Sequence, residues 1–383
     1  MELAETILVT GGAGFIGSHT VDLLLARGYR VRVLDNLQPR VHPHGWPAWL
    51  PAEVERIAGD VRDAAAWERA LDGVRGVFHL AAYQDYQPDF STFVHVNAVS
   101  TALLFEVIAA RRLPVEKVVL ASSQAVYGEG KYRCAEHGVF YPAARPLARL
   151  RAGQWEHPCP QCGADLEPVP LEESVVHPHT AYGISKYAAE LLGFQLGRRL
   201  GIPVVAMRYS IVQGPRNSLW NAYSGICRIF VKRLLRGQPP VVFEDGRQLR
   251  DYVHVADVAR ANLLVWERPE AEFQAYNVGG QRATSVLEFA TLAARACDAA
   301  IAPIVRGDFR LGDTRHTISD STKLRALGWA PQHGVEQILR DYVAWVREQG
   351  EPPDNAEQAA DEMRRAGVLV TATPSAQEVR AGS

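Results

Sequence analysis

The sequence lacks an excess of charge of either sign. Its 383 residues include 41 Lys and Arg against 43 Asp and Glu, which leaves a formal charge of −2. A nearly neutral chain has no electrostatic surface for nucleic acid or for an anionic membrane, so we predict neither partner. Uninterrupted apolar runs of about 20 residues, which a membrane span requires, are also missing.

Cysteine is scarce, and its pattern excludes a secreted disulfide framework. There are five cysteines, an odd number, and Cys159 and Cys162 are the one tight pair. The N-terminus has two early acidic residues and no basic segment before its first apolar run, which argues against a signal peptide. We therefore predict a cytoplasmic protein with reduced thiols.

Short apolar runs alternate with helical patterns along the chain. The predicted strands are residues 6–10, 30–35, 54–57, 76–80, 117–122 and 204–208, and the predicted helices are residues 15–26, 93–112 and 182–200. This order is typical of an α/β fold with a doubly wound parallel sheet. Residues 130–170 have no clear period and are predicted as a Cys-containing insertion. Residues 351–383 begin with two prolines and are predicted as a mobile tail, with a short helix over 356–365.

A glycine-rich loop follows the first predicted strand. Residues 10–17 read Thr-Gly-Gly-Ala-Gly-Phe-Ile-Gly, with Gly11, Gly14 and Gly17 at the spacing of a dinucleotide loop. Such glycines let the backbone turn sharply and approach a pyrophosphate, which binds at the N-terminus of the next helix. Asp35 closes the second strand, where a carboxylate accepts hydrogen bonds from ribose hydroxyls and repels a 2′-phosphate. The pattern favours NAD over NADP, although Arg40 lies near, and the alternative is an ordinary glycine turn.

A tyrosine and a lysine share one face of a predicted helix. Tyr182 and Lys186 are four residues apart, which brings their side chains together. A phenol is a weak base at neutral pH, and a neighbouring ammonium favours its phenolate. Ser123 lies just past the fifth predicted strand, at the carboxyl edge where such sheets bind ligands. The alternative for the pair is a surface helix contact without function.

Together these motifs resemble the extended short-chain dehydrogenase/reductase family, whose members act on nucleotide sugars. The resemblance extends from Thr10 to about Pro331. Further motifs that carry it are Asp35-Asn36, Gly59-Asp60-Val61, His79-Leu80-Ala81-Ala82, the run from Ala121 to Gly128, the run from Arg250 to Val258, and Gly312-Asp313-Thr314-Arg315-His316. The segment from Val126 to Cys134 and the later cysteine pair are most similar to dTDP-L-rhamnose 4-epimerase-like proteins.

The resemblance implies a Rossmann domain over residues 1–207 and a smaller C-terminal substrate domain over residues 208–350, of which 251–277 return to the first. It implies Ser123, Tyr182 and Lys186 as catalytic residues. The cofactor residues that it implies are Gly11, Gly14, Phe15, Ile16, Gly17, Asp35, Asn36, Asp60, Val61, Leu80, Ala81, Ala82, Asn97, Tyr182 and Lys186. For the nucleotide-sugar substrate, Arg250 and Arg315 match arginines that hold the diphosphate, with a structural ion pair as the alternative for each, and Gln84 and Gln124 lie near the sugar. The helices 93–112 and 182–200 match those that pair in family homodimers.

The residues after Ser123 bear on the reaction. Family dehydratases carry an adjacent acid and base there, whereas this chain has Gln124 and Ala125. We therefore expect NAD-dependent epimerisation, at C4 through a transient ketone. A dehydratase or decarboxylase that uses Asp85 or His79, a net dehydrogenase, and a non-catalytic NAD-bound sensor or scaffold remain alternatives. Ile211 stands where the family often has an Asn that contacts the substrate phosphate.

The insertion carries a candidate metal site. Cys134 and His137 form a C-x2-H pair, and Cys159 and Cys162 form a C-P-x-C-G turn. Three thiolates and one imidazole are a sufficient tetrahedral set for structural zinc, with His157 as a rival fourth ligand. The alternative is four unconnected residues in a surface loop.

Overall fold

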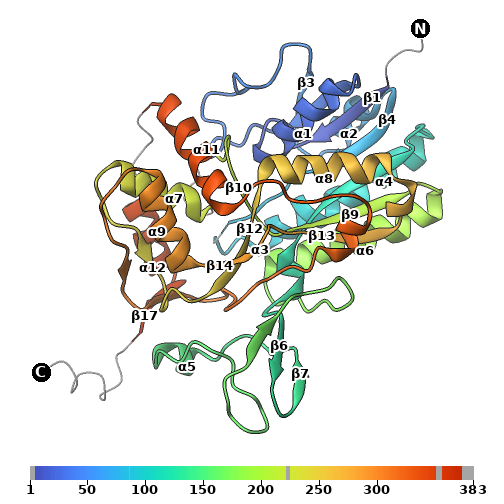
Figure 1. The fold of residues 1–383 in the computed structure, drawn as a ribbon. Coiled ribbons are helices and arrows are strands. Elements are labelled where there is room, and N and C mark those ends of the chain that lie inside the picture. Colours follow the sequence, from blue (N-terminus) through green and yellow to red (C-terminus); the bar gives the residue numbers. More distant parts are fainter. Residues whose placement is uncertain (1–4, 86, 221–224, 351–355, 373–383) are drawn as a thin grey trace, which may run out of the picture.

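The computed structural model describes residues 5–85, 87–220, 225–350 and 356–372 of the chain (Figure 1). Its centre is a seven-stranded parallel sheet in the order β13-β9-β5-β4-β1-β2-β3. The strands are β1 (Thr6–Thr10), β2 (Arg30–Asp35), β3 (Glu55–Ala58), β4 (Val74–His79), β5 (Lys117–Ser123), β9 (Val204–Tyr209) and β13 (Gln274–Val278). The predicted doubly wound α/β fold is confirmed, and the predicted strands agree to within two residues at each end.

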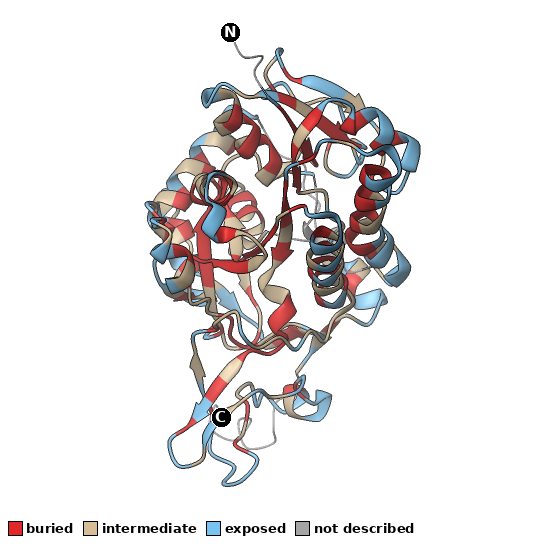
Figure 2. Ribbon diagram, turned by 90° about the vertical axis from the view of Figure 1, so that its right-hand side faces the viewer, coloured by how far each residue is buried: buried red, intermediate tan, exposed pale blue. Residues whose placement is uncertain are grey.

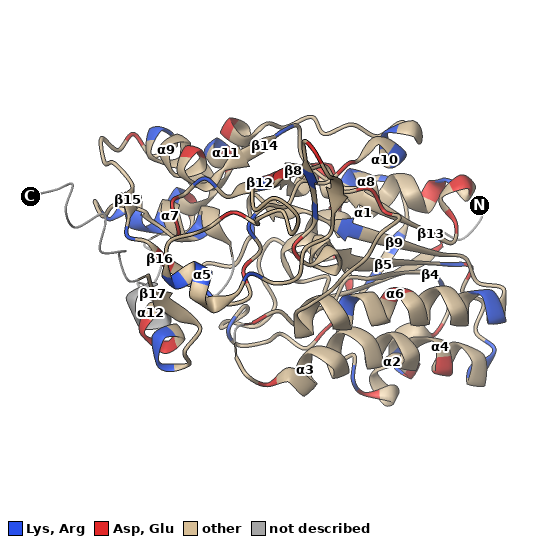
Figure 3. Ribbon diagram, turned by 90° about the horizontal axis from the view of Figure 1, so that it is seen from below, with Lys and Arg blue, Asp and Glu red and all other residues tan. Residues whose placement is uncertain are grey.

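Helices cover both faces of this sheet (Figure 3). One face carries α1 (Phe15–Ala26) and α8 (Val255–Glu267), which contact each other. The other carries α2 (Ala64–Leu71), α4 (Ser100–Arg111) and α6 (Ala181–Leu200). Because both faces are covered, β1, β4, β5, β9 and β13 are largely buried (Figure 2), whereas the edge strand β3 is mostly exposed. The order reverses between β1 and β4, so ligands are expected at the carboxyl ends of these strands.

A smaller C-terminal unit packs around its own apolar core. Its helices are α7 (Ile226–Leu235), α9 (Val286–Ala296) and α11 (Val335–Glu348), which contact one another. A three-stranded sheet of β10 (Ile211–Gln213), β12 (Leu249–His254) and β14 (Ala283–Ser285) lies beside them. Shorter elements complete this unit: β11 (Val241–Val242), β15 (Ile304–Val305), β16 (Asp308–Arg310) and α10 (Thr322–Ala326). After β12 the chain returns to the central sheet through α8 and β13, so the two units are joined by several crossings.

The insertion forms a separate small sheet that projects from the body (Figure 1). Strand β6 (Lys131–Cys134) pairs antiparallel with β7 (Gly138–Phe140) and β8 (Glu167–Val169), and α5 (Leu147–Arg151) lies between β7 and β8 in sequence. The buried apolar cluster of this sheet consists of four residues, Tyr132, Cys134, Cys159 and Leu166, with Phe140 packed against it. A core this small needs an additional crosslink to be stable.

The segment predicted as a tail is partly built into the fold. The predicted helix is present as α12 (Ala356–Arg365), but the sequence pattern did not predict β17 (Leu369–Thr371), which pairs antiparallel with β16. Residues 351–355 and 373–383 lie outside the described residues. The correction for residues 369–371 has a physical reason, because a three-residue strand carries too little periodicity to be recognised before its partner is known.

The predicted helix 93–112 is also more complex than its pattern. It consists of α3 (Phe90–Val94), a π-helical turn η1 (His95–Val99) and α4. By length and composition, the continuous stretch Phe90–Arg111 would be long enough to cross a membrane. Half of its most apolar window is buried inside the protein, and α4 packs on α2 and α6. Burial of this kind is typical of the core helix of a globular fold.

Candidate active site

The glycine loop between β1 and α1 is shaped by close backbone contacts. Gly11 has a φ of +67°, and a Cβ at Gly17 would lie 2.1 Å from the carbonyl oxygen of Gly11. A Cβ at Gly11 would lie 2.9 Å from the backbone of Ala81. Helix α1 begins after Gly14 without a side-chain cap, so its first N–H groups face the loop. A side chain at Gly11 or Gly17 would break the turn that exposes the first N–H groups of α1. The glycine loop therefore fits a pyrophosphate bound by these N–H groups.

The acidic residues predicted for the adenosine half cluster at the ends of β2 and β3. Asp35 accepts hydrogen bonds from the N–H groups of Ala13 (3.1 Å) and Leu37 (2.9 Å), and burial raises its pKa. Asn36 donates to Asp60 (3.1 Å). Hydrogen bonds from Arg62 lower the pKa of Asp60 to about 2. The glycine loop itself thus orients the carboxylate of Asp35, and the ribose of a bound dinucleotide would lie beside this carboxylate.

The segment after β4 contains three of the residues predicted to bind the cofactor, Leu80, Ala81 and Ala82. Thr10 of β1 accepts a hydrogen bond from the N–H of Ala81 (3.2 Å), and Leu80 and Ala82 flank that residue. Asn97, in η1, is buried and uses its amide within the protein, with bonds to the N–H and carbonyl of Tyr83 and to Ser185. In this structure Asn97 therefore fixes the loop at Tyr83 against α6, which is a positioning role.

The three predicted catalytic residues come from β5 and α6. Ser123 ends β5 and caps the 3-10 turn η2 (Gln124–Tyr127) by accepting from the N–H of Ala125 (3.1 Å). Tyr182 lies in the first turn of α6, which Thr180 caps, and its ring contacts Phe93 at 6.4 Å between centroids. Lys186 is buried and donates to the carbonyl of Ala121 (2.7 Å). Burial lowers the pKa of Lys186 to about 8, with Glu190 acting in the opposite direction.

A buried charge network holds α6 on the sheet next to these residues. Arg208 of β9 donates to both carboxylate oxygens of Glu190 on α6, at 2.9 and 2.7 Å. Ser122 of β5 also donates a hydrogen bond to Glu190, and Arg208 donates one to the hydroxyl of Tyr127. Because a carboxylate pairs here with a bidentate guanidinium, the helix has little freedom to slide along the sheet. The phenol and the ammonium are therefore kept in fixed register with Ser123.

One cavity of about 1120 Å³ is lined by two of the three predicted catalytic residues, Ser123 and Tyr182. Ser123, Tyr182, Gln84 and Gln124 line it, together with Phe15 and Ile16 of the cofactor loop. Among the described residues, the buried Oε1 of Gln124 has no hydrogen-bond partner, which leaves an acceptor for a ligand hydroxyl. Orphaned polar atoms continue along the wall at His179, Gln213, Gln248 and Tyr252. A large, polar-lined cavity of this kind suits a ligand with many hydroxyl groups.

The two arginines predicted for the diphosphate differ in their surroundings. Arg250 lines the cavity and is oriented by the carbonyls of Thr314 and Arg315. Arg315 is fully buried and does not line the cavity; its guanidinium binds Glu156, Glu244 and Asp245 at 2.5–3.0 Å. In this structure Arg315 lies outside the cavity lining, and its contact with the substrate remains a prediction. All of its donors are taken by carboxylates that the fold assembles around it.

Arg310 of β16 is a cationic side chain in the cavity lining that the sequence analysis missed. It lines the cavity, pairs with Asp313 (2.9 Å) and lies over the ring of Phe243 at 5.7 Å. The signal that could have found it is the strand-like alternation of residues 308–310, in which buried Phe309 points away from its two neighbours. That run is too short to be recognised alone.

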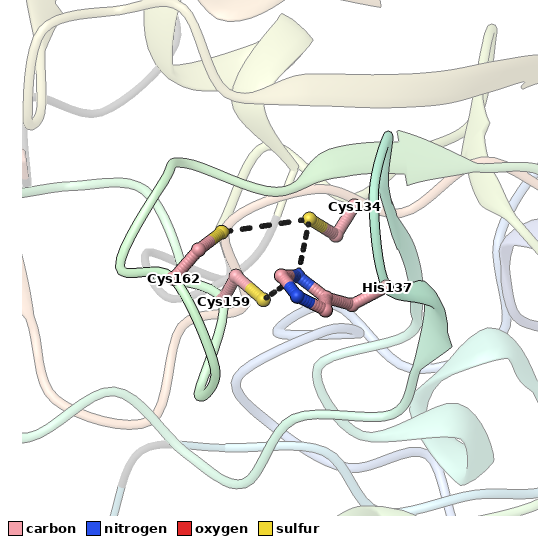
Figure 4. A group of neighbouring side chains, drawn as sticks. All are labelled: Cys134, His137, Cys159 and Cys162. Atoms are coloured by element: carbon pink, nitrogen blue, oxygen red, sulfur yellow. Dashed lines mark hydrogen bonds between the residues drawn. The ribbon is translucent and has the colours of Figure 1, made fainter.

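The insertion brings together the four predicted metal ligands (Figure 4). Their ligand atoms all lie within 4.8 Å of one another. Cys134 Sγ is 3.5 Å from His137 Nδ1 and 3.7 Å from Cys162 Sγ, and Cys159 Sγ is 3.6 Å from the same His137 atom. Ligands about 2.0–2.3 Å from a central ion at tetrahedral angles would be separated by about 3.5–3.8 Å. The donor set therefore fits zinc in its chemistry, and these three separations match a tetrahedral site.

His157 is not part of this cluster. Its Nε2 lies 3.1 Å from the carboxylate of Glu129, and the pair is almost completely buried. The neighbouring Glu156 binds Arg315 and His316, and Arg145 binds Glu244. Burial raises the pKa of Glu156, but the bonds from His316 and Arg315 outweigh it and lower the pKa to about 2. These pairs attach the insertion to the main body beside the cavity.

Comparison with known proteins agrees with this geometry. A sequence profile of the NAD dependent epimerase/dehydratase family matches residues 7–145 and 160–279. The dTDP-L-rhamnose 4-epimerase of Burkholderia thailandensis is 36% identical over 355 residues, which are 90% of this chain and 96% of that protein.

Solved structures of 4-epimerases have the same fold. The UDP-glucose 4-epimerase of Thermotoga maritima with UDP-glucose has a TM-score of 0.74 at 31% identity, over 90% of this chain and 99% of that one. The UDP-glucose 4-epimerase of Thermus thermophilus in complex with NAD has a TM-score of 0.68 at 30% identity, over 89% and 99%. With the glycine loop, the Tyr182–Lys186 pair and the shared fold, this chain belongs to the NAD-dependent epimerase/dehydratase family.

Proposed function

We propose that the protein inverts C4 of a nucleotide-activated sugar through a transient 4-keto sugar. The observation that carries this proposal is that Ser123 and Tyr182 line one cavity with the glycine-loop residues Phe15 and Ile16. NAD, when bound, supplies the acceptor and donor of the hydride. The residues that would hold it are those of the glycine loop, with Asp35 at the ribose and Asp60 and Val61 at the adenine.

The protein side of the reaction is proton transfer. Tyr182 takes the proton of the C4 hydroxyl as the ketone forms and returns it after the sugar has turned over. Lys186 stabilises the phenolate by its positive charge, and its bond to Ala121 holds the ammonium in place. The hydroxyl of Ser123 binds the same sugar oxygen and orients it toward Tyr182. The acceptor on Gln124 would bind a neighbouring sugar hydroxyl.

The surroundings of the cavity favour epimerisation over elimination. His79, one candidate acid for a dehydratase, is buried between Thr10 and Ser100, and burial lowers its pKa to about 3. His79 therefore stays neutral, and both of its hydrogen bonds are to hydroxyls that do not line the cavity. It cannot act as an acid toward a substrate in the cavity. Asp85 lines the cavity but accepts a hydrogen bond from Arg40 (2.8 Å).

Product analysis separates these reactions. We expect a purified enzyme without added cofactor to convert one nucleotide sugar of a panel into a new sugar of unchanged mass, measured by mass spectrometry and proton NMR. The panel begins with dTDP-L-rhamnose, because of the relative from Burkholderia, and includes UDP-glucose. Loss of one water would show a dehydratase, loss of carbon dioxide a decarboxylase, and accumulation of NADH a dehydrogenase. Each of these three results would contradict the proposal.

We also propose Arg250 and Arg310 as the residues that bind the substrate diphosphate. Both line the cavity, and both guanidiniums are oriented by neighbouring oxygen atoms. A planar guanidinium matches two phosphate oxygens at once. Ile211 also lines the cavity and offers no polar group to the phosphates.

A structural zinc ion in the insertion is the second part of the proposal. Cys134, His137, Cys159 and Cys162 would hold it, and the ion would crosslink β6 to the Cys159–Cys162 turn. The small core around Tyr132 offers little other stabilisation.

We expect about one zinc per chain in protein purified without chelator. In Cys159→Ser the zinc content should fall well below one, and limited proteolysis should cut within residues 130–170, because the turn loses its crosslink. Cys297→Ala is the control: its thiol is buried outside the cluster, so metal content and cleavage should stay unchanged. Full zinc occupancy in Cys159→Ser would overturn the site.

An apolar surface on α3 and α6 supports a homodimer. Phe90, Val94, Ile184 and Leu191 are 36% or more exposed, and the helices that carry them contact each other. Apolar side chains gathered in this way are typical of an interface between subunits. We propose pairing of two copies through this surface, in a cytoplasmic enzyme without nucleic-acid or membrane partners.

A further inference from the structure

The C-terminal segment of residues 356–372 is anchored against the strand that carries Arg310. In the antiparallel pair, Arg310 lies opposite Leu369 and Asp308 lies opposite Thr371. The hydroxyl of Thr371 also donates to Asp308 (2.8 Å), and the N–H of Leu311 donates to Val368 (2.9 Å). Met363 and Leu369 are buried, so the segment is a packed part of the C-terminal unit.

The two faces of this β16–β17 pair have different surroundings. Side chains at alternate positions share a face, so Asp308, Arg310 and Leu369 lie on one side, and all three line the cavity. Phe309 lies on the other side, where it is fully buried and packs on Trp155 of the insertion at 5.9 Å between ring centroids. The pair is therefore a wall with its inner face turned toward the ligand.

The segment lies away from the catalytic residues. In Figures 1 and 3, α12 and β17 are at the margin of the C-terminal unit, on the side remote from the central sheet and α6. The sugar carbon has to reach Tyr182, and the diphosphate has to reach Arg250 and Arg310. The remaining part of a nucleotide sugar, its base and ribose, then extends toward residues 360–369.

The chemistry of that end suits a nucleoside. Met363, Val368 and Leu369 give it an apolar side, as a flat heteroaromatic base requires. Asp361 and Arg364 also line the cavity, and Arg364 donates a hydrogen bond to Asp361 (2.8 Å). This pair offers one donor and one acceptor, which can bind the polar edges of the base or the ribose instead of each other.

We propose that residues 360–369 form the nucleoside-binding end of the substrate cavity and so determine affinity for the nucleotide half of the substrate. This inference rests on the proposed function, because it takes the ligand to be a nucleotide sugar. The segment acts in binding alone and leaves the proton transfer at Tyr182 unchanged.

Two truncations test this proposal with free dTDP and UDP as probes in calorimetry. Removal of residues 351–383 should weaken binding of the better probe by about tenfold or more, and should raise KM for the nucleotide sugar by a similar factor, with kcat at saturation and NAD content retained. Removal of residues 373–383 alone, which keeps α12 and β17, is the matched control and should change neither value. A folded, NAD-loaded chain that lacks 351–383 and still binds the probe normally overturns the inference.

A point variant covers the case in which the longer truncation fails to fold. Val368→Glu puts a negative charge in the wall and should weaken probe binding by about tenfold or more, whereas Val368→Thr, of nearly the same shape, should retain it. Unchanged binding by the folded Val368→Glu variant also overturns the inference. If the full chain binds neither probe, both this inference and the proposed function fail. If the probe binds and its binding depends on residues 360–369, but no sugar is converted, only the proposed epimerisation is refuted and the inference stands.

Discussion

Tyr182→Phe should lower kcat by about 10²–10⁴-fold, because it removes the group that takes and returns the proton of the sugar hydroxyl. The change deletes one oxygen atom and retains a ring that can keep its contact with Phe93. Folding, NAD content and KM should therefore change little. Initial rates with the substrate found by product analysis measure the effect, and the NAD absorbance of the purified variant shows that the site is intact.

Tyr187→Phe is the matched control for this experiment. Tyr187 lies on the same helix α6, but it packs against the apolar cluster of Val126, Tyr127 and Leu171 and does not line the cavity. Its kcat should remain close to that of the unaltered enzyme. Full activity of Tyr182→Phe would contradict the proton-transfer role. If the unaltered chain converts no sugar and Tyr182→Phe leaves the cellular phenotype unchanged, the non-catalytic scaffold would be favoured.

Arg315→Met should destabilise the folded protein by about 3–5 kcal/mol, the cost of removing one partner from a buried ion pair. The guanidinium of Arg315 binds three carboxylates, and Glu244 among them is almost completely buried. Without the cation, negative charges remain together in a region of low dielectric, with Arg145 as the remaining guanidinium beside Glu244. The free energy of unfolding, from urea denaturation, measures this change.

Arg310→Met is the comparison that separates the two arginines. Arg310 is partly exposed in the cavity, so its loss should cost little stability and should raise KM for the nucleotide sugar by about tenfold or more. The opposite pattern would be a stable Arg315→Met variant with raised KM and an unaffected Arg310→Met variant. It would show that Arg315 binds the diphosphate and would refute the assignment of this role to Arg310.

The proposed catalytic and cofactor residues belong mostly to local sequence patterns. The glycine loop is recognised because Gly11, Gly14 and Gly17 satisfy backbone demands within a single turn. Tyr182 and Lys186 are recognised because a helix repeats every 3.6 residues and places them on one face. The cysteine–histidine half-sites are short turns, and the structure shows that the two halves meet.

Other features depend on residues that are far apart in sequence. Arg310 and Arg315 are five positions apart in a segment without clear periodicity, and both match the charge that a diphosphate requires. Arg315 is withdrawn from the cavity by Glu156 of the insertion and by Glu244 and Asp245 of the C-terminal unit. Arg310 is turned toward the cavity by the pairing of β16 with β17, from a segment that its sequence presents as a tail.

The sequence by itself determined the α/β fold, the glycine-rich loop, the proposed Ser-Tyr-Lys set and the two halves of the proposed metal site, because each depends on spacing within one turn, one helix or one strand end. The tertiary structure decided which arginine lines the cavity, which histidine joins the cysteines and how the C-terminal segment pairs with β16. The physical reason is that the partners of a buried charge or of a three-residue strand are distant in sequence. They become neighbours only when the chain is packed. No local pattern specifies those partners in advance.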